Sequence, residues 1–467
     1  MSPQEQQHPL DVLILAAGLG TRMNSQKAKV LHELGGRPLI AHVTRKAHAL
    51  GYEKIYVVVG HQATEVEAAV RRELGSEANA AAFVTQKLQR GTGDAVMSAG
   101  EALKDSNSTL LVLSGDVPLV RAETLQNFVD YHRANGAACS ILSVKLENPT
   151  GYGRIVRDAS EGFARIVEQK DTTPEERLIR EINSGIYCFE TTKLFSALNE
   201  VKPTNQQGEY YLTDVPAILA ADGEKISIYL HQDAREVSGI NTRTDLAEFE
   251  NLLRRGTIRG LMMDGVTFID PSHAYVSAEA KIGRDCVIYP DVMIEGDTVI
   301  GDGCVIRSGS RITNSKVGTH VVIKDHCVIV DSEIDSNCTV GPFAHLRMST
   351  RLEEGSAIGN FVEVKKSRVG RGSKSMHLTY LGDATIGEQT NIGAGTITCN
   401  YDGKNKHETI IEDNVKIGSD TLLVAPVTVG SGSMTAAGSV VTKDVPPDSL
   451  VAGVPAVVKK KFKNGDE

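Results

Sequence analysis

The sequence predicts an α/β domain followed by a parallel β-helix, and three observations lead to this fold class. Short apolar runs alternate with amphipathic stretches in the first half, and aliphatic residues recur every six positions in the second half. The chain of 467 residues is also too long for one ordinary core. We therefore expect a first domain over residues 1–243, a helical linker over 244–264 and a second domain over 265–467.

The first half carries the pattern of a largely parallel sheet. The runs LILAA (13–17), IYVVVG (55–60) and LLVLSGD (110–116) are typical of buried strands, with helical stretches such as PLIAHVTRKAHAL between them. Strands that alternate with helices indicate an α/β domain. Ligands of such sheets bind at the carboxyl ends of the strands, so the loops that follow these runs are the places to search.

The linker is predicted to be a helix. Within TDLAEFENLLRRGTIRGLMMD (244–264), the residues Leu246, Phe249, Leu252 and Leu253 lie at helical spacing. This amphipathic pattern separates the two different rhythms of the chain.

The second half follows a six-residue period that neither a helix nor a simple alternating strand explains. The hexads fall in runs that start at residues 276, 317, 334, 369, 386 and 411 and end with the hexad at Val441. Of 28 hexads, 25 begin with Ile, Leu or Val. Hexapeptide periodicity is typical of a parallel β-helix, in which each leading side chain points into the core. Three hexads per coil predict about nine coils.

The cysteines fit this repeat better than they fit a redox or metal role. Cys286, Cys304, Cys327 and Cys338 all occupy the fifth position of a hexad, where a small side chain fills the core. The total of seven cysteines is odd and includes no CxxC pair, so neither a disulfide framework nor a zinc knuckle is supported.

Charge and hydropathy exclude several classes of partner. The formal net charge of −9 argues against a nucleic-acid coat, which needs a basic face. The amino-terminal decapeptide is polar, and the apolar run DVLILAA is too short to span a bilayer or to serve as a complete signal peptide. We expect small-molecule substrates, no nucleic-acid or membrane partner, and a cytoplasmic location.

A glycine-rich loop follows the first predicted strand. LAAGLGTRM (15–23) matches neither GxGxxG nor the P-loop, and a tight turn is the alternative interpretation. Gly18 and Gly20 would let backbone amides approach a triphosphate, while Arg22 and Lys29 would add positive charge. The loop therefore favours phosphate binding of an unfamiliar type.

The loop, with KVLH after it, resembles the signature of sugar-1-phosphate nucleotidyltransferases. Further motifs follow in chain order: QKLQRGTGDA (86–95), LSGDVPL (113–119), NPTGYGRIVR (148–157), IVEQKD (166–171), EINSGIY (181–187), QGEYYLTD (207–214) and VSGIN (237–241). They resemble one half of a bifunctional family, N-acetylglucosamine-1-phosphate uridylyltransferase joined to glucosamine-1-phosphate acetyltransferase. This resemblance implies an α/β nucleotide-binding, Rossmann-like domain and then a left-handed parallel β-helix.

The resemblance implies roles for individual residues of the first half. Those expected to bind UTP or the UDP-sugar are Leu15, Ala16, Ala17, Gly18, Lys29, Gln86, Gly91, Thr92, Ser114, Gly115, Asp116, Gly153, Glu168, Asn183 and Asn241. Gln86, Gly91 and Thr92 would read uracil, and Gly153, Glu168 and Asn183 would hold the sugar. Asp116 and Asn241 would hold Mg²⁺, although in isolation either residue could simply shape a turn. Asp94 stands where histidine is common in the family.

The implied reaction in this half is an in-line attack. The phosphate of N-acetylglucosamine-1-phosphate attacks the α-phosphorus of UTP, and pyrophosphate leaves. Arg22 and Lys29 are the predicted catalytic residues, because charge neutralisation and positioning supply most of the acceleration. No general base is predicted, since the nucleophile is already an anion.

The second half carries a matching set of motifs. GPFAHLR (341–347), FVEVKK (361–366), HLTYLGD (377–383), NIGAGTITCNYDGK (391–404) and IGSD (417–420) resemble the acetyltransferase half. The hexad of His377 begins at Ser375, one of the few leading residues that are not aliphatic. A histidine in a repeat more often lies on the surface or fills the core. Here the other motifs of the set favour a catalytic role for His377.

The resemblance makes His377 the general base that deprotonates the amine of glucosamine-1-phosphate. Glu363 would orient or polarise the imidazole. Arg347 and Lys365 would bind the sugar phosphate, with Tyr380 and Asn391 as further contacts. Acetyl-CoA is expected near Ala394, Asn400, Tyr401, Ser419 and Ala437, and backbone amides or Asn400 would stabilise the tetrahedral intermediate. A covalent route through Cys399 is possible in principle, but we interpret this cysteine as packing.

Two further expectations concern the β-helix. The step from Thr398 to Ile411 is one residue longer than two hexads, which predicts a protruding loop over 401–406. The resemblance also implies a homotrimer. Gly453 stands where relatives often have an arginine that meets the coenzyme phosphate, a contact that Lys459, Lys460 or Lys461 could replace.

Two alternative functions remain open from the sequence. The β-helix could be a non-catalytic oligomerising or regulatory domain attached to a nucleotidyltransferase. Alternatively, both halves could be vestigial parts of an assembly subunit. The set of His377, Arg347, Lys365 and Tyr380 speaks against the first alternative, and the presence of Arg22, Lys29, Asp116 and Asn241 speaks against the second.

Overall fold

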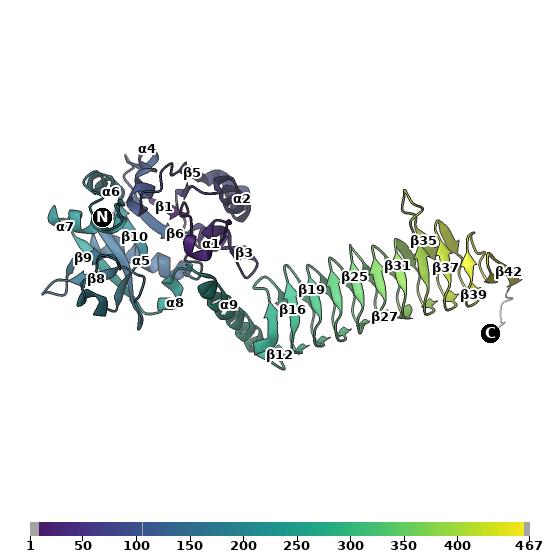
Figure 1. Cartoon of the computed structure of the whole chain (residues 1–467). Helices are drawn as coiled ribbons and strands as arrows, with labels where there is room; N and C mark the ends of the chain where they lie inside the picture. Colours follow the sequence, from purple (N-terminus) through teal and green to yellow (C-terminus); the bar gives the residue numbers. More distant parts are fainter. Residues whose placement is uncertain (1–8, 105, 462–467) are drawn as a thin grey trace, which may run out of the picture. The chain divides into compact units, whose positions relative to one another are not determined.

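The computed structural model describes residues 9–104 and 106–461 (Figure 1). Contacts between residues divide the chain into two compact units, Met1–Glu250 (unit 1) and Asn251–Glu467 (unit 2). The division falls inside helix α9 (Arg243–Met263), which occupies the predicted linker almost residue for residue. In the described ranges, no helix is both long enough and apolar enough to cross a membrane.

Unit 1 is built on one mixed sheet. Its main path runs in the order β11 (Ile226–His231), β7 (Cys139–Lys145), β10 (Glu181–Glu190), β6 (Thr109–Ser114), β1 (Leu10–Leu15), β4 (Lys54–Val59) and β5 (Ala81–Thr85). A hairpin of β8 (Arg154–Arg157) and β9 (Phe163–Val167) pairs with β10, and β2 (Glu33–Leu34) pairs with β3 (Arg37–Pro38).

The three strands predicted from apolar runs are confirmed as β1, β4 and β6. They pair in parallel, with β1 in the middle, and β5 and β11 also have parallel partners. The exception is β10, which runs antiparallel to both β6 and β7. Along its main path in the described residues, the sheet is therefore largely parallel, as predicted, with β10 as the one reversed strand.

Helices cover the sheet of unit 1 and bury two separate cores. They are α1 (Leu39–His48), α2 (Ala63–Leu74), α3 (Thr92–Met97), α4 (Gly100–Leu103), α5 (Ala122–Asn135), α6 (Thr191–Leu198), α7 (Val215–Ala221) and α8 (Ala234–Val237). Alternation along β1 sends Val12 and Ile14 into one core and Leu13 into the other. Burial on both faces explains why these strands are continuous apolar runs.

Unit 2 is a parallel β-helix with three sheets. In the described residues the sheets have twelve, ten and nine strands, and neighbouring strands are three apart in the chain order except at the end of the first sheet, where β39, β41 and β42 follow one another. The first sheet runs from β12 (Thr267–Phe268) to β42 (Ala456–Lys461), the second from β13 (Ala274–Val276) to β40 (Val440–Val441), and the third from β14 (Lys281–Ile282) to β38 (Val427–Val429). The coils are stacked one after another in Figure 1. The predicted three-sided coil is confirmed.

The leading residues of the hexads stack in columns. Ile288, Ile306 and Ile323 pair in register on successive coils and are fully buried. Ser375 lies in the same column between Ile358 and Ile392, and its buried hydroxyl has no hydrogen-bond partner in the described chain. The core is thus locally less apolar at the coil that carries His377.

The hexad cysteines are buried free thiols, as the packing interpretation predicts. Cys286 and Cys304 donate to carbonyl oxygens of the following coil, at 3.1 Å to Gly301 and 3.1 Å to Gly318. Burial raises the pKa of Cys327 to about 11. A thiol that stays protonated is a small core side chain and a poor nucleophile.

Substitutions at two neighbouring residues of one strand test whether the leading residues of the hexads form the core. Ile300 is 2% exposed and Val299 is 41% exposed on β17 (Val299–Ile300). We expect Ile300→Ala to lower the free energy of unfolding of unit 2 by about 2–5 kcal/mol, because it leaves a cavity between coils. Val299→Ala should change it by less than about 0.5 kcal/mol. Urea unfolding followed by circular dichroism measures both, and equal losses would contradict the assignment of Ile300 to the core.

Candidate active sites

The carboxyl ends of β1 and β6 form the floor of a cavity in unit 1, as the strand-end rule predicts. Leu15 and Ser114 end these strands as register partners. The cavity has a volume of ≈ 220 Å³. Its lining includes nine of the predicted residues, which are Leu15, Arg22, Thr92, Ser114, Asp116, Gly153, Glu168, Asn183 and Asn241. The structure therefore brings together side chains from seven separated motifs.

Four polar side chains converge at one corner of this cavity. Lys29 forms an ion pair with Asp116, whose other oxygen accepts from Ser114 Oγ at 2.6 Å. Asn241 Oδ1 accepts from Arg22 Nη2 at 2.8 Å and from Lys29 Nζ at 3.2 Å. Burial alone would raise the pKa of Asp116, but the charge and hydrogen bond of Lys29 outweigh it and lower the pKa. The carboxylate is thus ionised at neutral pH.

Gly20 makes the approach of Lys29 possible. Its φ is +63°, and a Cβ at this position would lie 2.5 Å from Lys29 Cβ. Only glycine readily adopts this backbone conformation and also leaves room for the Lys29 side chain. This gives the glycine-rich loop a specific role in placing the lysine.

The oxygens at this corner suit a magnesium ion. Asp116 and Asn241 both direct side-chain oxygens at Lys29 Nζ, and Mg²⁺ prefers carboxylate and carbonyl oxygens. Within the described ranges, no cluster of three or more His, Cys, Asp or Glu could hold a metal. A magnesium ion here would therefore share its coordination between these two side chains, substrate phosphates and water.

The residues predicted to hold the sugar have hydrogen-bond partners that the sequence did not single out. Asn183 Nδ2 donates to Tyr187 Oη at 2.6 Å, and Thr213 Oγ1 donates to Glu168 Oε1 at 3.3 Å. Burial raises the pKa of Glu168. Tyr187 and Thr213 both line the cavity and both stand inside the quoted motifs EINSGIY and QGEYYLTD. Their roles became visible only when the strands placed them beside Asn183 and Glu168.

The predicted uracil-reading residues lie in one turn after β5. Gln86 Nε2 donates to the Gly91 carbonyl at 3.1 Å and to Asp94 Oδ2 at 2.9 Å. Thr92 begins α3, and its hydroxyl accepts from Leu212 N at 3.1 Å. Of these residues, Thr92 lines the cavity itself. Ala16, Ala17, Gly18 and Gly115 lie in the loops that follow β1 and β6 and are not among the residues that line the cavity. Lys29 begins a short helix over residues 29–31 and reaches the cavity through its contacts with Asp116 and Asn241.

In unit 2, His377 ends the strand β30 (Lys374–His377) with an exposed side chain. Its Nδ1 is hydrogen-bonded to Asn360 Oδ1 at 2.9 Å, and Asn360 is its register partner at the end of β27 (Ala357–Asn360). An amide oxygen only accepts, so the hydrogen resides on Nδ1 and the lone pair on Nε2. This tautomer is the one that a general base with a free Nε2 requires.

Asn360 is therefore the hydrogen-bond partner of the predicted base, and sequence reasoning did not single it out. Glu363, which was expected to orient His377, instead accepts from Arg347 Nε at 2.8 Å and Arg347 Nη2 at 2.6 Å. The available signal was spacing: Asn360 precedes His377 by 17 residues, one coil of this helix. Stacking places side chains one coil apart next to each other.

The predicted phosphate-binding cations stack on one sheet. Arg347 and Lys365 are register partners at the ends of β25 (His345–Arg347) and β28 (Glu363–Lys365). Lys365 Nζ lies 3.1 Å from Asp383 Oδ2, which also accepts from Asn400 Nδ2 at 2.6 Å. Burial would raise the pKa of Asp383, but its bonds from Lys365 and Asn400 lower it. Asp383 ends the quoted motif HLTYLGD and was not predicted.

The remaining predicted residues divide into two groups. Tyr380 starts β31 (Tyr380–Gly382), and its Oη lies 3.5 Å from Asn400 Nδ2, so it joins the cluster around Asp383. Asn391 is exposed on β33 (Asn391–Ile392), beside Lys374. Within the described chain, no hydrogen bond or ion pair joins the Asn391 side chain to that cluster.

Three of the five expected coenzyme residues lie along one edge of the last coils, whereas Asn400 and Tyr401 follow β34 (Ile397–Cys399) of another sheet. Asp420 N donates to the Ala394 carbonyl at 2.6 Å, and Gly438 N donates to the Ser419 carbonyl at 2.8 Å. Ala394, Ser419 and Ala437 therefore occupy the same corner of successive coils. Gly453 has a φ of +102°, a conformation that an arginine at this position would adopt only with strain.

The protruding loop is confirmed between β34 (Ile397–Cys399) and β35 (Thr409–Ile411), where it stands out from the coils in Figure 1. Tyr401 and Lys406 bridge its base, and Tyr401 is 60% exposed. Asp402 accepts from Asn405 N and Lys404 N at 2.7 Å and from His407 Nε2 at 2.7 Å. These bonds lower the pKa of Asp402 and close the loop around its carboxylate.

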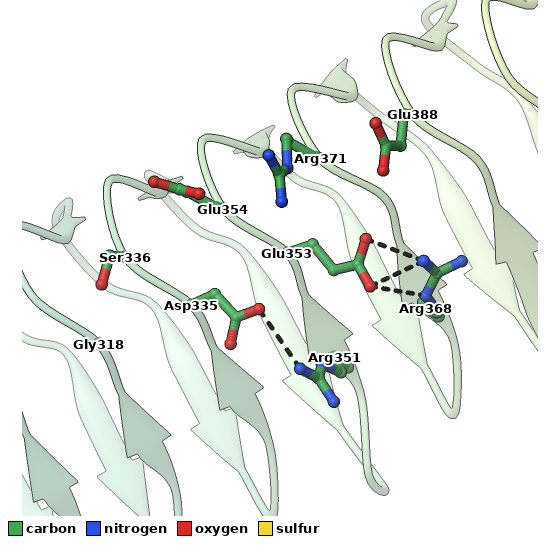
Figure 2. Close-up of a pocket in the computed structure, with 9 residues that line it drawn as sticks. All are labelled: Gly318, Asp335, Ser336, Arg351, Glu353, Glu354, Arg368, Arg371 and Glu388. Carbon is green, nitrogen blue, oxygen red and sulfur yellow. Dashed lines mark hydrogen bonds and ion pairs between the residues drawn. The ribbon is translucent and has the colours of Figure 1, made fainter.

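Two surface hollows mark the flank of unit 2. One, of ≈ 550 Å³, is lined by alternating acids and arginines, including the pairs Arg351–Asp335 at 3.5 Å and Arg368–Glu353 at 2.8 Å (Figure 2). It contains none of the predicted site residues. The other, of ≈ 440 Å³, is lined by Asp383, Lys366 and Lys406 among others and so adjoins the predicted acetyl-transfer residues.

Together, the mixed sheet with a phosphate-suited corner and the hexapeptide β-helix define a nucleotidyltransferase joined to a second transferase domain. Known families agree with this class. The model of the family described as nucleotidyl transferase matches residues 11–250, and that of the bacterial transferase hexapeptide repeats matches residues 279–314 and 408–443.

Relatives match almost the whole chain. The bifunctional protein GlmU of Geobacillus sp. (strain WCH70) is 50% identical over 94% of this chain and 94% of its own length. Those of Syntrophomonas wolfei and Heliobacterium modesticaldum are each 48% identical, over 94% and 98% of this chain and 96% and 97% of their own. The chain belongs to the bifunctional GlmU family.

Family membership confirms the predicted fold and function. The chain is a bifunctional transferase whose β-helix, left-handed in this family, acetylates glucosamine-1-phosphate. Its α/β unit then transfers a uridylyl group to form UDP-N-acetylglucosamine. Neither alternative, a non-catalytic β-helix or an assembly subunit with two vestigial halves, is supported.

The Lys29–Asp116 pair can be tested through stability. Lys29→Met leaves the carboxyl buried without its cation, so we expect the free energy of unfolding of unit 1 to fall by about 3–5 kcal/mol at pH 7. Because the pKa of Asp116 is lowered in the folded chain, the contribution of the pair is present above the unfolded pKa and is lost as the pH falls through the folded value. The gap between parent and variant should therefore close in acid.

Denaturation by urea at several pH values measures this gap. The exposed Arg22→Met is a matched control, which should cost less than about 1 kcal/mol. The double variant Lys29→Met with Asp116→Asn should recover part of the loss. A gap that does not depend on pH would contradict the pair as its source.

Proposed function

We propose that the corner of Arg22, Lys29, Asp116 and Asn241 is the site of uridylyl transfer. Arg22 and Lys29 would neutralise the triphosphate as the sugar phosphate attacks the α-phosphorus in line. Asp116 and Asn241 would hold Mg²⁺, which when bound would neutralise charge that builds up on the leaving pyrophosphate. The convergence of two cations and two oxygen ligands at one strand end is the observation that carries this proposal.

The neighbouring residues would select the two substrates. Gln86, Gly91 and Thr92 would contact uracil, and Leu15, Ala16, Ala17, Gly18, Ser114 and Gly115 would line the path of the nucleotide. Gly153, Glu168 and Asn183 would hold the sugar. The hydrogen bond from Asn183 to Tyr187 keeps the amide in place on the sugar side of the cavity.

We propose His377 as the general base of acetyl transfer. The amine nitrogen of glucosamine-1-phosphate would attack the thioester carbonyl as Nε2 takes its proton. The tetrahedral intermediate then expels the coenzyme thiolate, which receives the proton from the imidazole. The hydrogen bond that Nδ1 donates to Asn360 Oδ1 supports this role, because it leaves Nε2 free.

The cations of unit 2 would bind the sugar phosphate. Arg347 and Lys365 are each held by a carboxylate, Glu363 and Asp383, and Tyr380 and Asn391 would add sugar contacts. Glu363 would thus act on His377 only through the substrate and Arg347. Ala394, Asn400, Tyr401, Ser419 and Ala437 would bind acetyl-CoA, with Asn400 beside the reacting carbonyl.

Three broader features belong to the same proposal. A homotrimer would form through the β-helix, whose exposed aromatic side chains Phe343 and Phe361 stack with ring centroids 5.1 Å apart. The unpaired thiols suit a cytoplasmic location, where thiols stay reduced. The first domain would end at residue 243 and the second would begin at residue 265, with helix α9 as the linker between them.

His377→Ala tests the acetyl site. We expect release of free thiol from acetyl-CoA in the presence of glucosamine-1-phosphate to fall by about 10²–10⁴-fold, the usual contribution of a positioned base. Formation of UDP-N-acetylglucosamine from UTP and N-acetylglucosamine-1-phosphate should be unchanged. His320→Ala, an exposed histidine on another coil, is the control. Equal thiol release by parent and His377→Ala would refute the assignment.

Asp116→Asn tests the metal proposal. The change keeps the shape of the side chain and removes the charge that attracts Mg²⁺. We expect the Mg²⁺ concentration for half-maximal uridylyl transfer to rise at least about tenfold, equivalent to about 1.4 kcal/mol. The exposed Asp130→Asn, on α5, should leave it unchanged. A normal Mg²⁺ requirement in Asp116→Asn would place the metal elsewhere.

A further inference from the structure

Two acceptors hold the side-chain amide of Gln86 in one orientation. Its Nε2 donates to Asp94 Oδ2 at 2.9 Å and to the Gly91 carbonyl at 3.1 Å. A carbonyl oxygen and a carboxylate can only accept, so both require the NH₂ group on their side. If the amide were rotated by 180°, Oε1 would face two other oxygens.

The Asp94 carboxylate is itself fixed. Arg90 donates to its second oxygen from Nη2 at 2.9 Å and from Nε at 3.2 Å. The Arg90 guanidinium lies 5.3 Å from the centroid of the Tyr210 ring, and Tyr210 N donates to the Arg90 carbonyl at 2.7 Å. Gln86 and Asp94 are only 6% and 7% exposed. This series of contacts from Tyr210 through Arg90 and Asp94 to Gln86 thus has little freedom to rearrange.

The opposite atom of the amide, Gln86 Oε1, is available to a ligand. Among the described residues, none donates a hydrogen bond to it, and it is not one of the fully buried polar atoms without a partner. Gln86 directly follows β5 at the carboxyl end of the sheet and lies in the same turn as Thr92, which lines the cavity. A ligand at this position meets an acceptor and not a donor.

We infer that Asp94 is a positioning residue that makes Gln86 select a base with an imide N–H. Uracil carries a hydrogen on N3 and can donate it to Oε1. Cytosine has a lone pair on N3 at this place, which would face the Oε1 lone pairs. The inference rests on the proposed uridylyl site, and it adds the reason why that site would prefer UTP to CTP.

Asp94→Asn tests the inference, because its amide can donate to Oε1 of a rotated Gln86. We expect the preference for UTP over CTP, as the ratio of kcat/KM values with N-acetylglucosamine-1-phosphate, to fall at least about tenfold. The preference for UTP over dTTP should stay within about twofold, because thymine carries the same imide N–H. Asp94→Glu, which keeps an acceptor, should retain most of the UTP preference.

Two further variants separate positioning from folding. Glu73→Gln removes another carboxylate held by arginines, Arg37 and Arg45, and should leave both preferences unchanged. Gln86→Ala should lower the UTP preference by itself, and adding Asp94→Asn to it should lower the preference no further. If Asp94→Asn does not fold, Asp94→Ala should lower the preference by a smaller factor in the same direction, because the Gly91 carbonyl is then the one acceptor left to orient the amide.

The outcomes are distinguishable from a failure of the proposed function. A parent chain that makes no UDP-sugar from UTP would refute the uridylyl site itself. A parent that prefers UTP, together with a folded Asp94→Asn or Asp94→Ala variant that keeps the full preference over CTP, would refute the inference alone. A preference lost equally against CTP and dTTP would also refute it, because general loosening of the site would then be the cause.

Discussion

The stacking of parallel coils is the constraint on which unit 2 depends. Each short strand bonds to its equivalent on the next coil, so side chains one coil apart lie side by side. The same register that buries Ile288, Ile306 and Ile323 also brings Asn360 beside His377 and Arg347 beside Lys365. A slip of one residue would turn these polar side chains toward the core. Apolar columns inside the helix therefore set the geometry of the polar site outside it.

Both units hold the cations that we propose to bind phosphate with carboxylates. Lys29 pairs with Asp116 in unit 1, and Arg347 and Lys365 pair with Glu363 and Asp383 in unit 2. Such pairs hold long side chains in place before substrate arrives, which reduces the entropy lost on binding. They also weaken the field that a phosphate meets. A divalent cation at Asp116 would relieve this conflict in unit 1, because it would engage the carboxylate and leave Lys29 to the nucleotide.

The sequence was sufficient for the fold and for many of the side chains that line the cavity of unit 1, and insufficient for the residues that hydrogen-bond to the predicted site residues. Periodicity alone predicts buried columns, and motifs alone point to Asp116 or His377. Asn360, Asp383 and Tyr187 were missed because their partners are set by coil stacking or strand pairing. Glu363 was assigned to His377 by chemical type, whereas the register places Arg347 beside it. Spacing by one coil could have found Asn360 once the coil was shortened by one residue for the register slip between the hexads at Val364 and Val369.

In the proposed uridylyl site, Asp94 would determine which base is bound without touching the base. A buried carboxylate is costly without a cation, and Arg90, four residues earlier, supplies one from the same turn. If the residue at position 94 could either donate or accept a hydrogen bond, only the Gly91 carbonyl would fix the orientation of the Gln86 amide. The carboxylate removes that ambiguity, because it has no hydrogen to offer. Selectivity at Gln86 then depends on the hydrogen bond behind the amide as much as on the atom in front of it.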